Sequence, residues 1–426
     1  MPKTTRQMIA ALLLLGTATG FAVPAAAAKK EEAPKASGLK LSKPVQAALA
    51  EAQKAQAAGD LPGALAKVRA AEAVPGVTPD DVYMTNAVKL NVAIATRTAA
   101  GTATPNPADP LLEEALNGMI ATGKVSTEDK PKFIRNLSSL ALQRGDYNTA
   151  TKHMEELVAL TPNDADAVAN LAQLYQKQKQ SGKAVETLNR AIAARKASGQ
   201  PVDESWYRSA LGIAYDSKLA AQIQPSAIAL VTAYPNPVNW RDALVILRDS
   251  SKLDDQGNLD VMRLMAAAGA LNGERDFAEY AETASMKGLP GEAKAALAAG
   301  KAKGALNATK PFVVELSKTV DGKVAADRAA LPGLDRESRA AANGKAALGT
   351  ADAYFGYGDY AKAADLYKVA LTKGSVDADT ANLRLGAALA RSGDKAGATA
   401  ALGNVHAGTR ATLAQYWLIW LGQQKA

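Results

Sequence analysis

The two histidines, His153 and His406, are the first candidates for metal binding or proton transfer. Neither has a second histidine three or four positions away, and neither lies in an H-E-x-x-H pattern, so the sequence predicts no zinc site. The chain contains no cysteine, which removes thiolate ligands and cysteine nucleophiles. We therefore expect both histidines to be structural or surface residues.

Adjacent carboxylates recur along the chain and could supply the acid and the base of a glycoside hydrolase. They include Asp80-Asp81, Glu113-Glu114, Glu155-Glu156 and Asp254-Asp255. Such an enzyme needs two carboxyl groups about 5–10 Å apart in a cleft that binds sugar. With five Phe and four Trp, the chain offers few aromatic faces on which a sugar could stack. The Glu155-Glu156 pair is expected to face solvent, and we predict no catalytic pair.

Two segments match ligand-binding loops only in part. Residues 253–260, "LDDQGNLD", lack the D-x-[DN]-x-[DN]-G spacing and the final Glu of a calcium loop, so we expect an interhelix loop there. Residues 344–350, "GKAALGT", lack the G-x4-G-K-[ST] pattern of a phosphate loop, and the sequence has no G-x-S-x-G. We expect a protein that is not an enzyme and that binds no cofactor and no metal.

The composition indicates helices built from small apolar residues. Hydrophobic residues make up 48% of the 426 residues but aromatic residues only 5%, so Ala, Leu and Val dominate. This length exceeds one compact core and suits several domains or one extended solenoid. The formal net charge of +8 is spread along the chain without a Lys/Arg tract interleaved with aromatics, so we expect no nucleic-acid partner.

The first residues have the pattern of a secretory signal peptide. Lys3 and Arg6 precede a short apolar run, and an Ala-rich A-x-A site follows, which predicts a signal peptide over 1–28 and a flexible leader over 29–44. No other segment approaches the ~20 uninterrupted apolar residues of a membrane span, so we expect no integral membrane segment after cleavage. Export without disulfides suits a bacterial periplasm or exterior, and we expect a periplasmic or secreted protein.

The stretch at 142–164, "LQRGDYNTATKHMEELVALTPND", belongs to a helical hairpin that repeats. In a 34-residue unit from Pro131, the inward positions are Ile134, Leu137, Ser138, Ala141, Ala150, Met154 and Leu157. The same offsets from Ala165 give Val168, Leu171, Ala172, Tyr175, Ala184, Leu188 and Ala191. Both sets follow helical periodicity, and small residues fall where two helices must approach closely. A third unit begins near Ser205, and further units follow in the C-terminal part.

Gly-Asp pairs mark the turn of four such hairpins. They are Gly59-Asp60, Gly145-Asp146, Gly358-Asp359 and Gly393-Asp394. These positions resemble the tetratricopeptide repeat (TPR) family, strongly over 131–196 and 344–405, and more weakly over 45–76 and 205–300. The resemblance implies an all-α fold, a TPR-like α-solenoid of stacked antiparallel helical hairpins.

The expected domain organisation follows from the leader and the repeat offsets. After the leader come degenerate helical hairpins at 45–130, TPR-like repeats at 131–217, degenerate helical repeats at 218–343, TPR-like repeats at 344–405 and a capping helix at 406–426. We expect this last helix, which carries Trp417 and Trp420, to cover the open end of the stack.

In the TPR family the first helix of each hairpin lines a concave surface that binds a peptide. The outward positions of these helices are then Lys132, Arg135, Asn136, Ser139 and Gln143 in the first unit, Asp166, Asn170, Gln173 and Lys177 in the second, and Trp206, Ser209 and Ile213 in the third. A second candidate surface lies in the C-terminal repeats around Lys345, Asp352 and Arg384.

Two functions remain open at this point. The first is a non-catalytic periplasmic TPR protein that mediates protein–protein interaction, an adaptor or scaffold in cell-envelope assembly, secretion or polymer export. Its partner would be a protein or peptide, within an envelope-associated complex. The alternative is an α-solenoid enzyme or carbohydrate-binding protein of the cell envelope. An enzyme should show a deep pocket with two converging carboxylates, whereas an adaptor should not.

Overall fold

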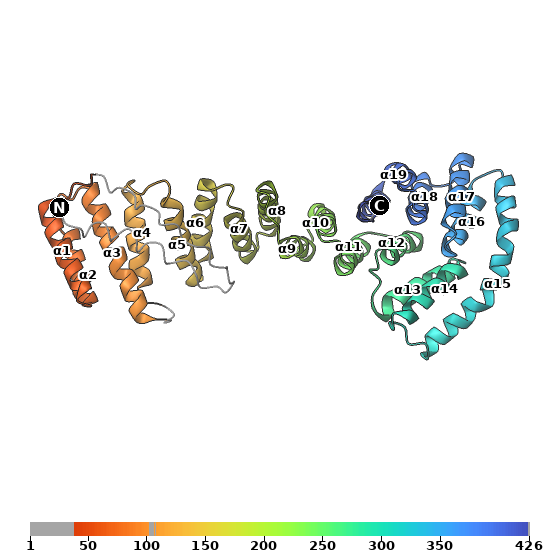
Figure 1. Cartoon of the computed structure of the whole chain (residues 1–426), viewed down its shortest axis with the longest axis horizontal. Helices are drawn as coiled ribbons and strands as arrows, with labels where there is room; N and C mark the ends of the chain where they lie inside the picture. The colour runs from red at the N-terminus through yellow and green to blue at the C-terminus, as the bar shows by residue number, and fades with distance from the viewer. Residues whose placement is uncertain (1–37, 102–105, 107, 425–426) are drawn as a thin grey trace. The chain divides into compact units, whose positions relative to one another are not determined.

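The computed structural model describes residues 38–101, 106 and 108–424. The predicted signal peptide and residues 29–37 of the predicted leader lie outside these ranges. Within them the chain forms twenty α-helices and no β-strand (Figure 1). The helices divide into two compact units, Met1–Pro201 and Val202–Ala426. Each is a stack of antiparallel helical hairpins, which confirms the predicted fold class.

The helices of the first unit are α1 (Lys43–Ala57), α2 (Leu61–Glu72), α3 (Pro79–Ala100), α4 (Asp109–Ala121), α5 (Lys130–Gln143), α6 (Tyr147–Leu160), α7 (Ala165–Lys177) and α8 (Ser181–Ala197). Those of the second unit are α9 (Glu204–Asp216), α10 (Ala220–Ala233), α11 (Pro237–Ser250), α12 (Asp255–Ala267), α13 (Gly273–Met286), α14 (Pro290–Ala302), α15 (Pro311–Ala340), α16 (Lys345–Gly356), α17 (Tyr360–Lys373), α18 (Ala378–Ser392), α19 (Lys395–Gly403) and α20 (Gly408–Gln423).

The Gly-Asp pairs form the predicted turns, and each residue of the pair has its own task. The glycines Gly59, Gly145, Gly358 and Gly393 have φ between 75° and 91°, where a side chain would be strained. The aspartates Asp60, Asp146, Asp359 and Asp394 cap the next helix, because each carboxylate accepts a hydrogen bond from the backbone N–H three residues on. Only two or three residues therefore separate the end of one helix from the start of the next.

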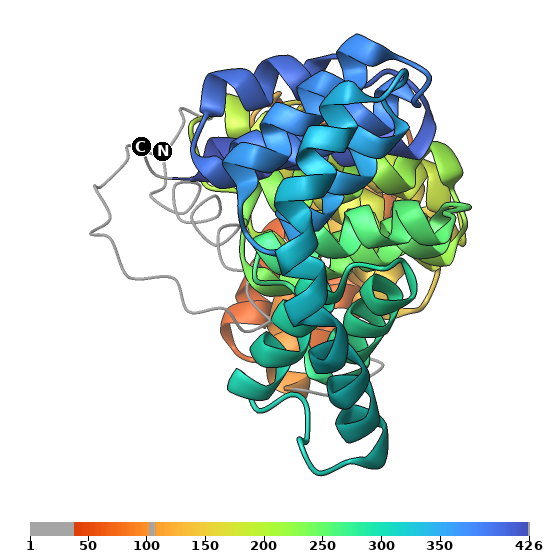
Figure 2. The ribbon, with the colours of Figure 1, turned by 90° about the vertical axis from the view of Figure 1, so that its right-hand side faces the viewer.

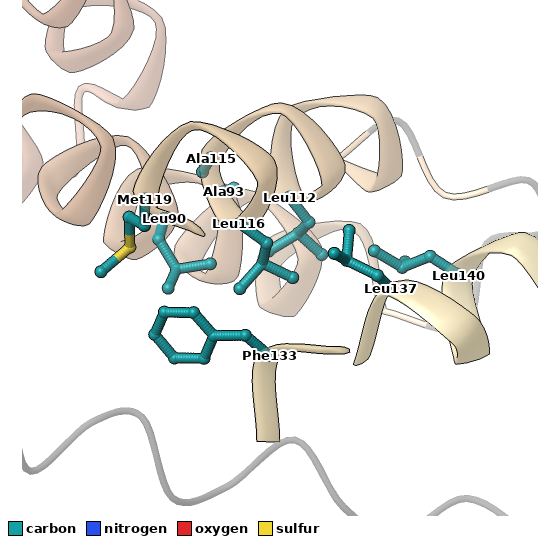
Figure 3. Packing of buried hydrophobic residues seen from close by; sticks show 9 residues of the cluster. All are labelled: Leu90, Ala93, Leu112, Ala115, Leu116, Met119, Phe133, Leu137 and Leu140. Atoms are coloured by element: carbon teal, nitrogen blue, oxygen red, sulfur yellow. The ribbon is translucent and has the colours of Figure 1, made fainter. Parts of the chain in front are cut away.

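Small residues allow the hairpin helices to approach closely, as the repeat pattern predicts. Ser138 on α5 is buried and its Oγ donates a hydrogen bond to the carbonyl of Ala150 on α6, at 2.9 Å. In the next hairpin Ala172 and Ala184 are both buried. Figure 3 shows the larger core side chains that join α3, α4 and α5, among them Leu116 and Phe133.

The second unit contains contacts between helices far apart in sequence. Helix α20 packs against α18 and α19, and also against α10 and α12. Helix α12 also contacts α18. The 30-residue α15 packs against both α14 and α16, and in Figure 2 it runs down the side of this unit that faces the viewer. The last helices of the unit therefore return to its first ones.

The interhelix loop predicted at 253–260 is wrong for most of that segment. Asp254 caps α12, because its carboxylate accepts the backbone N–H of Gly257 at 2.7 Å, and the helix begins at Asp255. A side chain at position 257 would press against the side chain of Leu253, so a glycine suits this position in the first turn of α12. The last residue of the segment, Asp260, is buried in α12.

Candidate functional site

The first unit has a hollow between α3, α4 and α5, with a volume of about 500 Å³ that includes open solvent. Its floor consists of Leu90, Leu112, Leu116 and Leu140, all of which appear in Figure 3. Its rim consists of Ile94, Arg97, Asn136, Ser139 and Gln143. We call this set of residues the α3–α5 hollow.

Two helices place the rim residues by simple periodicity. Asn136, Ser139 and Gln143 are spaced three and four apart on α5, which puts them on one face of that helix. On α3, Arg97 follows Ile94 by three residues on the same face. Helix α3 is fixed at its start by a capping box, in which the side chains of Thr78 and Asp81 each accept a hydrogen bond from the other's backbone.

Among the described residues that line the hollow, Arg97 is the only cation, and its charge is balanced by a carboxylate. Its Nη1 donates to Oδ1 of Asp109 at 2.9 Å, and Asp109 is itself buried at the start of α4. Its Nη2 donates to Oε1 of Gln143 at 3.4 Å. Because Gln143 accepts through its carbonyl, its amide NH2 remains able to donate. The rim therefore presents amides and a hydroxyl rather than a net charge.

The cations on and next to α5 are also held in ion pairs. Lys130 pairs with Glu156 at 3.0 Å, Lys132 with Asp129 at 3.0 Å, Arg135 with Asp164 at 2.6 Å and Arg144 with Glu113 at 2.6 Å. Exposed pairs of this kind contribute little to stability, about 0–1 kcal/mol each. Their effect here is on recognition, since an incoming anion would have to displace a carboxylate that is already present.

The structure separates the predicted contact residues into groups. Asn136, Ser139 and Gln143 line the α3–α5 hollow, whereas Lys132 and Arg135 are exposed on α5 outside its lining. Asn170, Gln173 and Lys177 are exposed along one side of α7, and Asp166 on the same helix pairs with Arg195 of α8. Trp206 is half-buried and Ser209 exposed on α9 of the second unit, but Ile213 is buried, so the prediction that it faces outward is wrong.

Sequence reasoning missed Ile94 and Arg97. They lie within residues 45–130, where the repeat offsets were too degenerate to assign inward and outward positions. A signal was nevertheless present, because Leu90, Ile94 and Arg97 are spaced four and three apart on one helix face.

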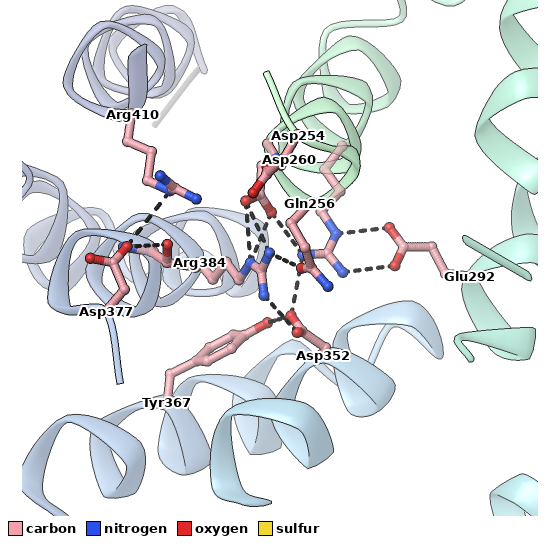
Figure 4. Close-up of polar contacts among 12 residues, drawn as sticks. Asp254, Gln256, Asp260, Glu292, Asp352, Tyr367, Asp377, Arg384 and Arg410 are labelled. Carbon is pink, nitrogen blue, oxygen red and sulfur yellow. Dashed lines mark hydrogen bonds and ion pairs between the residues drawn. The ribbon is translucent and has the colours of Figure 1, made fainter. Parts of the chain in front are cut away.

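The second unit contains a group of buried charges drawn from four helices, which we call the buried ion cluster (Figure 4). Its members are Asp260 and Arg263 of α12, Glu292 of α14, Asp352 of α16 and Arg384 of α18. Arg263 donates two hydrogen bonds of 2.8 Å to Glu292, and Arg384 donates to Asp352 at 2.7 Å and to Asp260 at 2.9 Å. Three carboxylates thus share two guanidinium groups.

Two phenols complete the cluster. Tyr280 donates to Glu292 at 2.8 Å, and Tyr367 donates to Asp352 at 2.6 Å. Burial, and then the charge of the neighbouring carboxylate, raises the pKa of each phenol well above its ordinary value. Burial lowers the pKa of the Arg384 guanidinium, but the attraction of Asp260 and Asp352 outweighs it and raises this pKa. Both phenols and this guanidinium therefore keep their protons at neutral pH.

The cluster overturns the prediction of a second contact surface around Asp352 and Arg384. Both side chains are buried, and Arg384 donates to Asp352 and to Asp260, so neither side chain faces solvent; Lys345 is exposed. A small cavity adjoins the cluster and is lined by Phe355 and Trp417, among others. The carboxylates converge as in an active site, but each is hydrogen-bonded to a guanidinium, so the arrangement joins helices rather than transferring protons.

His153 is half-buried on α6, and His406 is exposed between α19 and α20. In the described parts of the chain, no group of three or more His, Asp or Glu side chains is arranged to hold a metal ion. Among the helices of those same parts, none is both long and apolar enough to cross a membrane.

Comparison with known proteins finds a family model that matches the C-terminal part of the first unit. The family model described as tetratricopeptide repeat matches residues 141–200, which contain α6, α7 and α8. This segment is similar to tetratricopeptide repeats. TPR segments typically mediate protein–protein interaction, because stacked hairpins leave a concave face for a partner. No curated protein sequence matches the chain.

Several solved structures are similar to parts of the chain. The MamA protein is 15% identical, with 44% of this chain and 91% of MamA covered, at a TM-score of 0.28. A tetratricopeptide repeat protein from Parabacteroides merdae is 12% identical, with 66% and 99% covered, at 0.28. The pilF protein of Pseudomonas aeruginosa is 15% identical, with 65% and 90% covered, at 0.19.

Proposed function

We propose that this chain is a non-catalytic TPR adaptor or scaffold of the bacterial periplasm, and that it holds a protein or peptide partner in the α3–α5 hollow. The observation that carries the proposal is the hollow itself, which lies on the helices next to the TPR segment and has an apolar floor under a polar rim. Apolar area provides binding free energy, and a few polar groups fix the orientation of a ligand.

The proposed location rests on the charged, then apolar, then Ala-rich order of residues 1–28. An adaptor in cell-envelope assembly, secretion or polymer export would work in this compartment. Intact-mass measurement of the exported protein checks the location, since cleavage predicts a mature chain that begins near Ala28 or Lys29. A mass that retains residues 1–27 would contradict it.

The contact itself is tested by crosslinking the mature protein to its partner in the periplasm of the source organism. The double variant Asn136→Ala with Gln143→Ala removes two rim amides. A hydrogen bond contributes about 0.5–1.5 kcal/mol net, so losing two should weaken capture about 5- to 150-fold.

The matched control is the double variant Asn189→Ala with Gln176→Ala, which removes two exposed amides outside the lining of the hollow. It should leave capture unchanged. Circular dichroism should be the same for both variants, because all four side chains lie outside the core. Capture that survives loss of Asn136 and Gln143 at full strength would show that the partner binds elsewhere.

A further inference from the structure

We infer that the α3–α5 hollow takes an uncharged, extended, internal segment of its partner, anchored by an aliphatic side chain, and that it does not capture a terminal carboxylate. This inference rests on the proposed function and specifies the chemistry of the ligand. The charge balance, the leucine floor and the polar rim of the hollow each support it independently.

The charge balance argues against an anionic ligand. The guanidinium of Arg97 is committed to Asp109, and the nearby cations Lys132 and Arg135 are committed to Asp129 and Asp164. An incoming carboxylate would lose its hydration and would then compete with a carboxylate that is held in place. Capture of a chain terminus is strengthened by a cation that has no carboxylate partner, and each of these three cations is already paired with a carboxylate.

The floor selects an aliphatic side chain. Leu90, Leu112, Leu116 and Leu140 are the floor residues, and all of them are branched aliphatics. A charged or amide side chain placed there would lose its hydrogen bonds to water without replacement. A Leu, Ile, Val or Met side chain has no such hydrogen bonds to lose, and it gains free energy as its apolar surface leaves water.

The rim selects an extended backbone over a helix. Each of the amides of Asn136 and Gln143 offers both a donor and an acceptor, which matches the N–H and C=O of a peptide unit. A helical ligand has no backbone groups to offer in its interior, because they are bonded within the helix. Seven residues along α5 span about 10 Å, which is the length of about three residues of an extended chain.

The test uses the full mature chain, labelled with a dye, and a bead library of nonapeptides with acetylated N-termini and amidated C-termini. Each selected sequence is then made again as the amide and as the free acid. We expect selected peptides to share a central Leu, Ile, Val or Met. The amide and the acid should bind equally within about twofold, and a rise from 50 to 500 mM salt should change Kd less than about threefold.

The site is checked with Ser139→Trp and Gln143→Trp, two exposed rim positions at which an indole would fill the hollow. Each should weaken peptide binding more than tenfold. Asn189→Trp, at an exposed position of α8 outside the hollow, is the matched control and should bind like the parent. Helical circular dichroism reports whether each variant remains folded.

Three results would overturn the inference: selection of acidic peptides, tighter binding of the free acid by more than tenfold, or binding that neither rim variant weakens. In all three cases a peptide still binds, so the proposed adaptor function would stand, although the third result would place its binding site outside the hollow. That function would instead fail if neither the library nor the periplasmic crosslinking yielded a protein or peptide bound to the folded chain.

Discussion

Replacing Arg384 with Met should destabilise the second unit strongly and leave the first unit unchanged. Arg384 is 3% exposed, and its guanidinium donates to Asp260, Asp352 and Gln256. Without it, Asp352 keeps the phenol of Tyr367 and a long contact of 3.3 Å to Arg263. Three carboxylates would then share one guanidinium in a site that water does not reach.

The expected magnitude follows from this geometry. Removing one partner of a buried ion pair costs about 3–5 kcal/mol, because the remaining charge is left buried without compensation. At a denaturant slope of about 3 kcal/mol per M, the urea midpoint of the second unit should fall by about 1–1.7 M. Adding Asp352→Asn removes one of the unpaired charges and should recover part of this loss.

The chain provides a selective probe for the assay. All four tryptophans, Trp206, Trp240, Trp417 and Trp420, lie within Val202–Ala426. Tryptophan fluorescence therefore follows unfolding of the second unit, whereas far-ultraviolet circular dichroism follows both units. The fluorescence transition should move to lower urea, while the part of the dichroism transition that belongs to the first unit should stay in place.

Arg339→Met is the matched control. Arg339 also pairs with two carboxylates, Asp335 and Asp365, but its side chain is 44% exposed, so water can replace the lost contacts. The free energy of unfolding of Arg339→Met should differ from that of the parent by no more than about 1 kcal/mol. A fluorescence midpoint for Arg384→Met as close to the parent as that of Arg339→Met would refute the view that the cluster stabilises the second unit.

Three further predictions concern the first unit. The hydrogen bond from Arg69, with that from Lys89, lowers the pKa of Glu114 from 4.5 to about 2. The charge of Glu114 therefore stabilises the fold above about pH 4.5, and this stabilisation is lost as pH falls through 2. Glu114→Gln should flatten the dependence of Tm on pH between 5 and 2, as measured by circular dichroism. Ala184→Leu should lower the free energy of unfolding by about 1–3 kcal/mol through overpacking against α7, and an unchanged urea midpoint would contradict the repeat assignment. Asp146→Ala should lower it by about 1 kcal/mol through loss of the α6 cap, whereas Asn148→Ala, at an exposed position in the first turn of the same helix, should leave it within about 0.5 kcal/mol.

The sequence was sufficient for the parts of the fold that depend on local chemistry. Gly145 and Asp146 could be recognised because a left-handed glycine and a capping aspartate are adjacent in the chain, and Ser138 because it repeats with the helix period. The start of α12 was missed because the capping role of Asp254 also fits a loop residue. These features depend on a few neighbouring residues and recur in each hairpin.

The buried ion cluster could not be found in the same way. Arg384 and Asp260 are 124 positions apart, and nothing near either residue distinguishes it from a solvated charge on a helix. Their meeting depends on how several hairpins turn relative to one another, which no single repeat encodes. Arg97 is an intermediate case. Its position on one face of a helix could be predicted from the sequence, but the residues on the other side of the hollow could not.

The return of α20 to α10 and α12 affects the order in which the second unit can fold. Trp240 Nε1 donates to Gln423, 183 positions later, and Gln423 donates to the carbonyl of Val231. In a solenoid with contacts only between neighbours, each hairpin can fold as soon as it leaves the ribosome. Here α10 and α12 wait for a helix that is synthesised many residues later, which raises the contact order of the unit and is expected to slow its completion. Until then the face that receives α20 stays open to other chains, and exposed surface of this kind favours aggregation.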